Sequence, residues 1–532
     1  MTSACAPSRP TSTSPRSSTH RVSWERPGAA RALGLALAAG LAWVLAAPPF
    51  GWWALGWLAP ALLLLALAGQ RARVGCAAGF LAAFAFQCLF GWWLLPAGVN
   101  AAAYLAGAAL CAAYAGVFGA GAVVLERRAP ALAPLAIPSL WGVLEWLRAN
   151  LGWLAAPWGV LGDTQSSRPE IAGVAALAGV WGVSFVLMGA GVGVAGLVRW
   201  GRAALPVRPA SALLALALVG LLAAGGVLAH RAAAPPERTL RVAVIQAGRY
   251  VPGQGTRADA LAVFERYRML TRAAAAEKPA LVVWPESALP ASLPSDVAAR
   301  AALADLAREV GAHLLVASSG RDKSRPAGAA DRWANSVFLF SPAGQIEARY
   351  DKIRLLPFNE YVPLRRWLDW PAWIARDMRD AEAGAERTVF RIGEARFAAL
   401  ICWENLFSRE FRASAAQGVD FMVSLTNEAF TEVGPGREQL FAINRLRAVE
   451  NGVALARAAT TGVSGFVAPD GRVAARVRDA SGRSLDATGW AWHDLPLAAA
   501  PTPYRRFGDW IVGAEVAILL AAAVAAKGAR GT

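Results

Sequence analysis

Residues 396–404 read RFAALICWE, and the fold prediction starts from them. The mostly apolar run from Arg396 to Cys402 predicts a short buried strand that Cys402 closes, and a tryptophan and a glutamate follow directly. Residues 280–287, ALVVWPES, show a similar arrangement, because a short apolar strand is again followed by a glutamate, Glu286. Reactive side chains just beyond strands are typical of α/β sheets, where ligands and chemistry collect at strand ends.

Similar short apolar runs surround these two segments. We predict further strands at 241–246, 313–318, 336–340, 421–426 and 453–459, with helices at 256–277, 295–310 and 437–450 between them. A hairpin turn around Pro342 and Gly344 places Lys352 just beyond another strand. The alternation of short strands with helices predicts a layered α/β domain over residues 240–505.

The remainder of the chain is too apolar for an ordinary soluble protein. Of its 532 residues, 56% are hydrophobic and 17% are charged, whereas charged residues make up about 25% of a typical globular domain. Apolar stretches that are each long enough for about one bilayer crossing lie at 31–47, 51–69, 74–95, 101–125, 131–147, 171–198, 210–230 and 509–526. We therefore predict a membrane domain of eight helices, seven before the α/β domain and one after it.

These patterns predict five regions. They are a disordered cytoplasmic tail at 1–28, a seven-helix membrane domain at 29–230, a linker at 231–239, the α/β domain at 240–505 and a C-terminal membrane helix at 508–527.

Basic residues between the apolar stretches predict the orientation. The short connections on the side of the membrane away from the N-terminus carry only two basic residues, Arg148 and Arg168. The segments on the same side as the N-terminus carry fourteen, namely Arg9, Arg16, Arg21, Arg26, Arg31, Arg71, Arg73, Arg127, Arg128, Arg199, Arg202, Arg208, Lys527 and Arg530. Positively charged loops stay in the cytoplasm. We therefore expect the N-terminus inside, and the α/β domain on the periplasmic side of a bacterial inner membrane.

Composition also excludes several classes of function. The cations behind the formal charge of +16 form no compact patch beside stacking aromatic residues, so no nucleic-acid partner is expected. Among the five cysteines only Cys402 lies in the α/β domain, which argues against a disulfide framework. The four histidines are scattered and no spacing is typical of a zinc site, so we expect neither a metal nor a cofactor.

Three reactive residues follow predicted strands: Glu286, Lys352 and Cys402. Taken singly, each has an ordinary structural explanation, as a turn residue, a surface cation and a small buried apolar side chain. Together they supply what acyl transfer needs, since a thiol requires a base to become a nucleophile and the developing oxyanion requires a cation. Lys352 is also one of only four lysines among 53 lysines and arginines. The three residues therefore predict a covalent acyl-transfer site.

The same residues carry a resemblance to a known family. Glu286, Lys352 and Cys402, in the segments WPE, YDK and CWE, resemble the triad of the nitrilase, or carbon–nitrogen hydrolase, superfamily, which implies a four-layer αββα sandwich. Residues 352–363, KIRLLPFNEYVP, the predicted flanking helices and the segment around Glu145 to Trp158 resemble the apolipoprotein N-acyltransferase branch. The resemblance covers about residues 30–526.

That family implies a two-step reaction. Cys402 takes an acyl chain from a phospholipid as a thioester, and the chain then passes to the α-amino group of the N-terminal diacylglyceryl-cysteine of an apolipoprotein. Glu286 is implied as the general base, Lys352 as the cation that faces the oxyanion, and the backbone N–H of Trp403 as a further donor. Glu360, Glu404 and Asn335 match positions that support the site. The implied partners are the phospholipid, the apolipoprotein and the membrane, and we expect the enzyme to act as a monomer.

Two segments leave structural alternatives open. Glu145 and Arg148 are either an interfacial anchor at a helix end or a pair that shapes the cavity beneath the α/β domain. Residues 364–378 are either an amphipathic helix packed on that domain or a lid that dips into lipid headgroups through Trp367, Trp370 and Trp373.

The sequence departs from the family pattern in two loops, 246–249 and 427–439, which we place along the path of substrate access. These departures leave open a related enzyme that acylates another amine. Two further alternatives are a membrane-anchored amidase, in which water resolves the thioester, and a transporter with an outer binding domain. Eight helices exceed what a simple tether needs. Apart from Glu145 and Arg148, the predicted spans show no paired ionisable residues at mid-bilayer depth, which weakens the transporter alternative.

Overall fold

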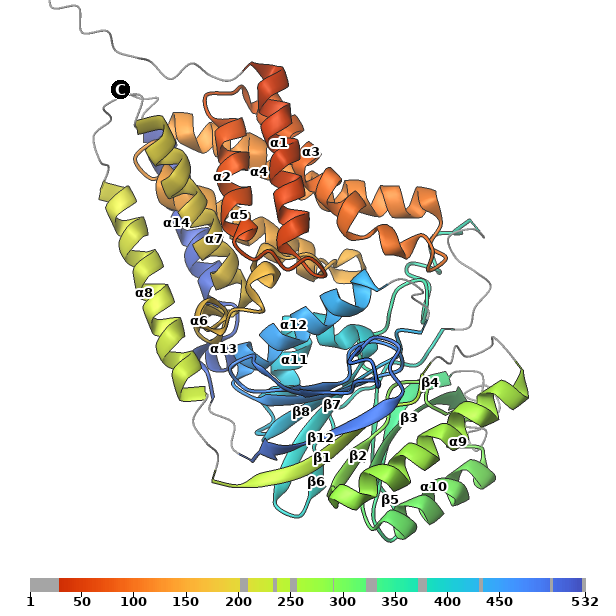
Figure 1. The fold of residues 1–532 in the computed structure, drawn as a ribbon. Coiled ribbons are helices and arrows are strands. Elements are labelled where there is room, and N and C mark those ends of the chain that lie inside the picture. Colours follow the sequence, from red (N-terminus) through yellow and green to blue (C-terminus); the bar gives the residue numbers. More distant parts are fainter. Residues whose placement is uncertain are drawn as a thin grey trace, which may run out of the picture.

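The computed structural model describes residues 28–200, 209–232, 237–248, 256–289, 291–321, 333–371, 380–429, 434–497 and 501–528. The chain forms a helical half and an α/β half that lie against each other (Figure 1). The last helix, α14 (Trp510–Gly528), follows the α/β half in sequence but packs among the N-terminal helices. The predicted tail at 1–28 lies outside the described residues except for Gly28.

The N-terminal helices coincide with the predicted apolar stretches to within a few residues. They are α1 (Ala29–Ala46), α2 (Leu55–Leu67), α3 (Ala72–Phe90), α4 (Ala101–Arg128), α5 (Ala133–Asn150), α6 (Pro169–Ala172), α7 (Val174–Trp200) and α8 (Pro209–Ala232). Within the described residues, five helices are long and apolar enough to cross a membrane, namely α1, α3, α4, α7 and α14. Helices α2 and α8 contain shorter apolar stretches. The predicted helical half is therefore confirmed, with helices that could cross a membrane, and the count of eight spans stays a prediction.

Helix α7 is interrupted at Gly179, whose backbone is not helical (φ 67°, ψ −178°). Glycine suits this position, because a Cβ there would lie 2.5 Å from the ring of Tyr504. The break leaves the backbone N–H of Val180 available, and it donates to Glu450 of the α/β half at 2.9 Å. Glu450 is fully buried and also pairs with Arg447 at 2.7 Å. The kink thus forms a polar joint between the two halves.

The α/β half contains two stacked sheets (Figure 1). Within the described residues, these are two six-stranded sheets with the orders β12-β1-β2-β3-β4-β5 and β11-β10-β9-β8-β7-β6. The strands are β1 (Thr239–Gln246), β2 (Leu281–Val283), β3 (His313–Arg321), β4 (Trp333–Phe340), β5 (Ile346–Asp351), β6 (Phe390–Ile392), β7 (Ala395–Ile401), β8 (Phe421–Thr426), β9 (Ala454–Ala459), β10 (Gly465–Val467), β11 (Val473–Arg476) and β12 (Gly489–Pro496). Strands β1 to β3 run parallel, as do β7 to β9, and antiparallel strands flank both sets.

The two sheets enclose one apolar core, and helices cover their outer faces. Val242 of β1 and Leu400 of β7 belong to the same buried cluster between the sheets. Helices α9 (Arg257–Ala274) and α10 (Val297–Val310) cover the first sheet through a second cluster that contains Tyr267 and Leu306. Helices α11 (Ser408–Ala415) and α12 (Pro435–Asn451) cover the second sheet on the side of the helical half, next to the short α13 (Pro503–Phe507) (Figure 1). This arrangement is the αββα sandwich that the resemblance implied.

Every strand predicted from the sequence exists, with its ends shifted by a few residues. The prediction missed β6, β10, β11, β12 and α11. β6 and β10 have three residues each, and β12 is half-buried along most of its length. Segments so short or so evenly half-buried carry little periodic contrast between apolar and polar residues.

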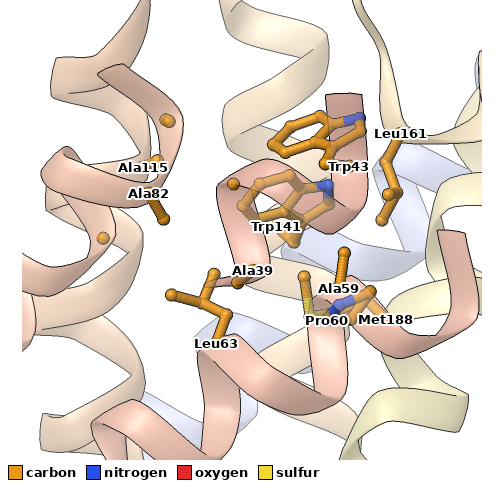
Figure 2. A pocket seen from close by; sticks show the side chains of 13 residues that line it. Ala39, Trp43, Ala59, Pro60, Leu63, Ala82, Ala115, Trp141, Leu161 and Met188 are labelled. Carbon is orange, nitrogen blue, oxygen red and sulfur yellow. The ribbon is translucent and has the colours of Figure 1, made fainter. Parts of the chain in front are cut away.

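A small apolar cavity lies inside the helical half, between helices α1 to α5 and α7. Its walls include Trp43, Leu63, Trp141 and Met188 (Figure 2). The cavity measures about 20 Å³, which is close to the space that one water molecule requires. The cavity is too small for the acyl chain that the resemblance implies.

Candidate active site

Glu286 lies in the turn that follows β2, and its carboxylate is held on both sides. The residue is 6% exposed. Its Oε1 accepts a hydrogen bond from Asn335 Nδ2 at 2.7 Å, and its Oε2 accepts one from the backbone N–H of Asn427 at 2.8 Å. Ser287 follows with φ 56°, in the left-handed region that non-glycine residues rarely adopt. The local backbone and the two donors therefore fix the direction of this carboxylate.

Lys352 directly follows β5 and is 1% exposed. Its backbone N–H donates to the carbonyl of Asn335, and its Nζ lies 2.8 Å from Oε1 of Glu360, which is also buried. Burial alone would lower the pKa of the Lys352 ammonium, but the nearby Glu360, Cys402, Glu286 and Glu404 outweigh it and hold that pKa above its usual value. The residue is therefore a buried, permanently charged cation.

Cys402 directly follows β7 and opens a 3-10 turn, Cys402–Leu406. Its φ of 53° lies in the left-handed region, a strained conformation that is often found at reactive positions. Glu286 lies close enough to the thiol to act on its ionisation. Burial raises the pKa of the Cys402 thiol, Glu286 raises it further, and Lys352 opposes both. The resting sulfur is therefore a neutral thiol, with a carboxylate in place to accept its proton.

Glu404 ties the ends of two strands together. Its carboxylate is fully buried. Oε1 accepts from the backbone N–H groups of Ile353 at 2.8 Å and Arg354 at 3.0 Å and from the Tyr350 hydroxyl at 2.8 Å. Oε2 accepts from the N–H of Ile401 at 2.9 Å. One side chain thus holds the segment after Lys352 against the turn that carries Cys402.

Asn335 and Glu360 complete a chain of contacts around the cation and the base. Asn335 Nδ2 donates to Glu286 and also to Glu360 Oε1, at 3.3 Å. The second oxygen of Glu360 accepts from the backbone N–H of Leu356 at 2.7 Å. Each residue that the sequence placed in a supporting position therefore contacts a member of the predicted triad or the backbone next to one.

Trp403 faces the helical half rather than the sheets. Its ring lies 6.2 Å from that of Trp158, centroid to centroid. The backbone around Trp158 is held by Arg148, whose Nη1 donates to the Trp158 carbonyl at 2.8 Å, and by Glu145, whose Oε1 accepts from Leu161 N at 2.7 Å. Glu145 and Arg148 are 4% and 5% exposed, so the interfacial-anchor interpretation is wrong. They fix the loop that the α/β half rests on.

A cavity of about 330 Å³ lies next to Trp403. It lies between residues 152–155 of the helical half and the residues that follow Lys352 and Cys402, namely Ile353, Arg354 and Trp403. Because its walls include the residues adjacent to Lys352 and Cys402, this cavity is the candidate place for a substrate.

The tryptophan-rich segment is not a helix in its described part. Residues 363–367 form a turn. Trp370 packs against Phe358 and against Trp153 of the helical half, and its indole N–H donates to the Pro363 carbonyl at 2.7 Å. Trp367, in contrast, is 82% exposed. Trp373 lies outside the described residues. The packed-helix alternative is therefore wrong for the turn at 363–367.

Three side chains in the two loops that depart from the family pattern are buried in packing contacts, whereas the backbone of Asn427 in the second loop holds Glu286. Gln246 is buried and bonded to Ser464 and Ser484, and Glu428 pairs with Arg457 in the interior. Gln439, 2% exposed, donates to the carbonyl of Phe90 at the end of α3 and accepts from the Trp93 indole N–H, 3.2 Å away. The expectation that these three side chains line substrate access is therefore wrong. Arg249 and residues 430–433 lie outside the described residues.

Some residues of the site were missed by sequence reasoning. Arg354 lines the cavity and Tyr350 bonds to Glu404, although both stand within three residues of Lys352. Their closeness in sequence to Lys352 could have indicated that they belong to the site. Glu515 of α14 is a further buried ionisable residue that the sequence pattern did not single out, and it packs against Gly142 of α5.

The described residues contain no group of three or more His, Cys, Asp or Glu side chains placed to hold a metal ion. The site supplies a thiol together with a carboxylate and a charged ammonium that both act on its ionisation. These are the parts of nucleophilic acyl transfer with general-base help.

Comparison with known proteins extends over both halves. Residues 39–193 match the apolipoprotein N-acyltransferase N-terminal domain, and residues 241–485 match the carbon-nitrogen hydrolase family. The chain is 30% identical over 525 residues to an apolipoprotein N-acyltransferase of Geobacter metallireducens, covering 93% of this chain and 95% of that protein. It is 30% identical to one of Allorhizobium ampelinum, with the same shares covered. A solved amidase from Nesterenkonia sp. is similar at 20% identity and a TM-score of 0.39, over 53% of this chain and 97% of that one.

Proposed function

The chain belongs to the apolipoprotein N-acyltransferase family, and from this premise we propose how its site transfers an acyl chain. The donor is a membrane phospholipid, and the acceptor is the α-amino group of the N-terminal diacylglyceryl-cysteine of an apolipoprotein. Cys402 carries the acyl chain between them as a thioester. The proposal rests on the electrostatic effects of Glu286 and Lys352 on Cys402. Residues adjacent to Lys352 and Cys402 also line a cavity that the helical half helps to form.

In the first step the Cys402 sulfur attacks the ester carbonyl of the phospholipid while its proton moves to Glu286. The thiol needs this base because its raised pKa leaves it protonated at neutral pH. The carbonyl oxygen becomes an oxyanion that the Lys352 ammonium and the backbone N–H of Trp403 stabilise. The carbon–oxygen bond then breaks, Glu286 returns the proton to the leaving alkoxide, and a lysophospholipid departs from the thioester.

In the second step the neutral α-amino group of the acceptor attacks the thioester carbonyl. Its proton moves to Glu286, and the oxyanion again faces Lys352. When the carbon–sulfur bond breaks, the departing sulfur takes the proton from Glu286. The products are the N-acylated lipoprotein and the free Cys402 thiol.

Trapping of the thioester tests this mechanism. Incubation with a radiolabelled phospholipid should give an acyl adduct that hydroxylamine removes and that Cys402→Ala lacks. Cys111→Ala is the matched control, because Cys111 lies on α4 in the helical half and should leave labelling unchanged. Acyl transfer by Cys402→Ala at the wild-type rate would contradict the covalent route. Release of free fatty acid from the thioester when acceptor is present, without acylated acceptor, would instead indicate an amidase-like hydrolase.

We also propose that all eight predicted helices span the membrane and that the α/β half faces the periplasm. The loop-charge asymmetry supports this orientation. A reporter that is active only outside the cytoplasm should work when fused after Arg238 and remain silent when fused after Arg128. The reverse result would refute the orientation. We further propose a monomer that works on lipid substrates without nucleic acid.

We propose that the segment with Trp367, Trp370 and Trp373 is a lid, in which Trp367 enters the lipid headgroups and Trp370 anchors the turn. The high exposure of Trp367 and the packing of Trp370 on Trp153 support it, because one ring is available to lipid while the other is anchored. Trp367→Ser should slow transfer from bilayer phospholipid more than transfer from a short-chain soluble ester. Equal losses for both donors would argue against contact with the bilayer.

A further inference from the structure

The cavity next to Trp403 combines apolar walls with a single type of charge. Its described lining includes the aromatic or apolar side chains of Trp153, Leu355, Trp403 and Phe407. Among the described residues that line it, Arg354 is the only one with a charged side chain. Such a lining suits a molecule that is apolar over most of its length and anionic at one point.

The contacts of Arg354 leave its positive charge incompletely neutralised. Its guanidinium carbon lies 3.6 Å from the centroid of the Phe407 ring, and Nη2 donates to the Gly152 carbonyl at 3.2 Å. Its carboxylate partner is Glu410, at 3.7 Å, which is beyond ordinary hydrogen-bond distance. Glu410 also pairs with Arg387 at the much shorter distance of 2.6 Å. Glu410 therefore pairs with two cations, and it lies farther from Arg354 than from Arg387.

The position of Arg354 is fixed relative to the nucleophile. Glu404 accepts hydrogen bonds from the backbone N–H groups of both Arg354 and Ile401, the residue before Cys402. The side chain of Arg354 is 28% exposed, so a bound molecule can reach it. The backbone of Arg354 is therefore held in a fixed relation to the turn that carries Cys402, and its side chain lines the same cavity as Trp403.

We infer that Arg354 binds the phosphate of the glycerophospholipid acyl donor during the first half of the reaction. The inference rests on the proposed function and adds a recognition site to it. In a glycerophospholipid the reacting ester and the phosphate are joined through the same short glycerol unit. A guanidinium suits a phosphate through its fork of N–H donors. The diacylglyceryl-cysteine acceptor has a thioether where the phospholipid has its phosphate, so Arg354 distinguishes donor from acceptor within one cavity.

Measuring the two steps of the reaction separately distinguishes phosphate binding by Arg354 from a structural role of this residue. The full-length protein is incubated with either a phospholipid or the diacylglycerol with the same acyl chains, and thioester formation on Cys402 is measured at low donor concentration. Arg354→Gln should slow labelling by the phospholipid about 10- to 100-fold, as expected for the loss of a hydrogen bond between charged groups. Labelling by diacylglycerol should not change. Once acylated with a p-nitrophenyl ester, the variant should pass its acyl chain to a diacylglyceryl peptide at the wild-type rate.

Arg308→Gln is the matched control, because Arg308 is an exposed arginine on α10 that pairs with Asp305. It should leave both donors unaffected. Arg354→Lys, which keeps the charge but loses the fork, should retain part of the preference for phospholipid, and it serves in place of Arg354→Gln if that variant does not accumulate. Equal losses with both donors, or a loss in the second half-reaction, would overturn the inference in favour of a structural role, and unchanged labelling would overturn it outright. Absence of phospholipid labelling in the wild type would refute the proposed function instead.

Discussion

Replacing Lys352 with arginine keeps the positive charge and changes only the shape of the group that carries it. The lysine side chain is 1% exposed, and its Nζ lies 2.8 Å from Glu360 Oε1, so the ammonium occupies a closed space. A guanidinium is a planar fork that needs more room than an ammonium, which is a compact charge with three rotatable donors. The substitution therefore tests whether any positive charge suffices at this site or whether the compact ammonium is required.

The expected cost has two parts. Extra atoms in a closely packed interior cost about 1–3 kcal/mol of folding stability. Displacement of the cation from the oxyanion should lower kcat by about 10²–10³-fold, as the loss of one oxyanion donor does. Lys352→Met should lower activity at least as far, and it should destabilise the fold by about 3–5 kcal/mol because it leaves Glu360 buried without its cation. The arginine variant is thus expected to lose much of its rate while losing less stability than the methionine variant.

The assay measures acyl transfer from phospholipid to a diacylglyceryl peptide in detergent, together with thermal unfolding of the same preparations. Lys278→Arg is the matched control, since it makes the same exchange on an exposed side chain and should retain wild-type activity. A folded Lys352→Arg protein with more than about a tenth of wild-type activity would fall outside the loss expected for a displaced oxyanion donor. That result would refute the argument that this site requires a compact ammonium.

Three further predictions concern the base, the support of the site and the joint between the halves. Because Glu286 raises the pKa of the Cys402 thiol, alkylation of wild-type Cys402 by iodoacetamide should rise only above the ordinary thiol pKa of about 8.5. In Glu286→Gln the rise in alkylation should move to lower pH, and acyl transfer should fall about 10²–10⁴-fold. Alkylation is measured on the Cys402 peptide, and an unchanged pH profile would show that Glu286 does not act on the thiol. Glu404→Gln should reduce kcat and destabilise the protein by about 2–3 kcal/mol, since the carboxylate accepts four hydrogen bonds from both strand ends; normal kcat in this variant would show that the support is dispensable. Gly179→Ala should lower the unfolding temperature, because its φ of 67° and the nearby Tyr504 ring both oppose a Cβ, and an unchanged unfolding temperature would show that the kink tolerates a side chain.

Much of this protein follows from local patterns in its sequence. The apolar stretches predict the helical half because crossing a bilayer requires a minimum length of apolar residues, which a single segment either has or lacks. The strands that end before Glu286, Lys352 and Cys402 were predictable for a similar reason, since a buried strand is a short apolar run bounded by turns. That the three residues belong together followed from chemistry, because a thiol, a base and a cation form one reacting set.

The tertiary structure alone decided how the site is held and where a substrate can lie. Glu404 looked like one glutamate after a tryptophan, yet it accepts from backbone groups about fifty residues away. Glu145 and Arg148 had the local signature of an interfacial anchor but are buried beneath a loop. Gln439 donates a hydrogen bond to the carbonyl of Phe90 at the end of α3, which lies far from it in sequence. These roles depend on which backbone donors and acceptors are left unpaired when the two halves meet. A buried polar group must find a partner, but residue type and spacing do not specify which distant group that partner is.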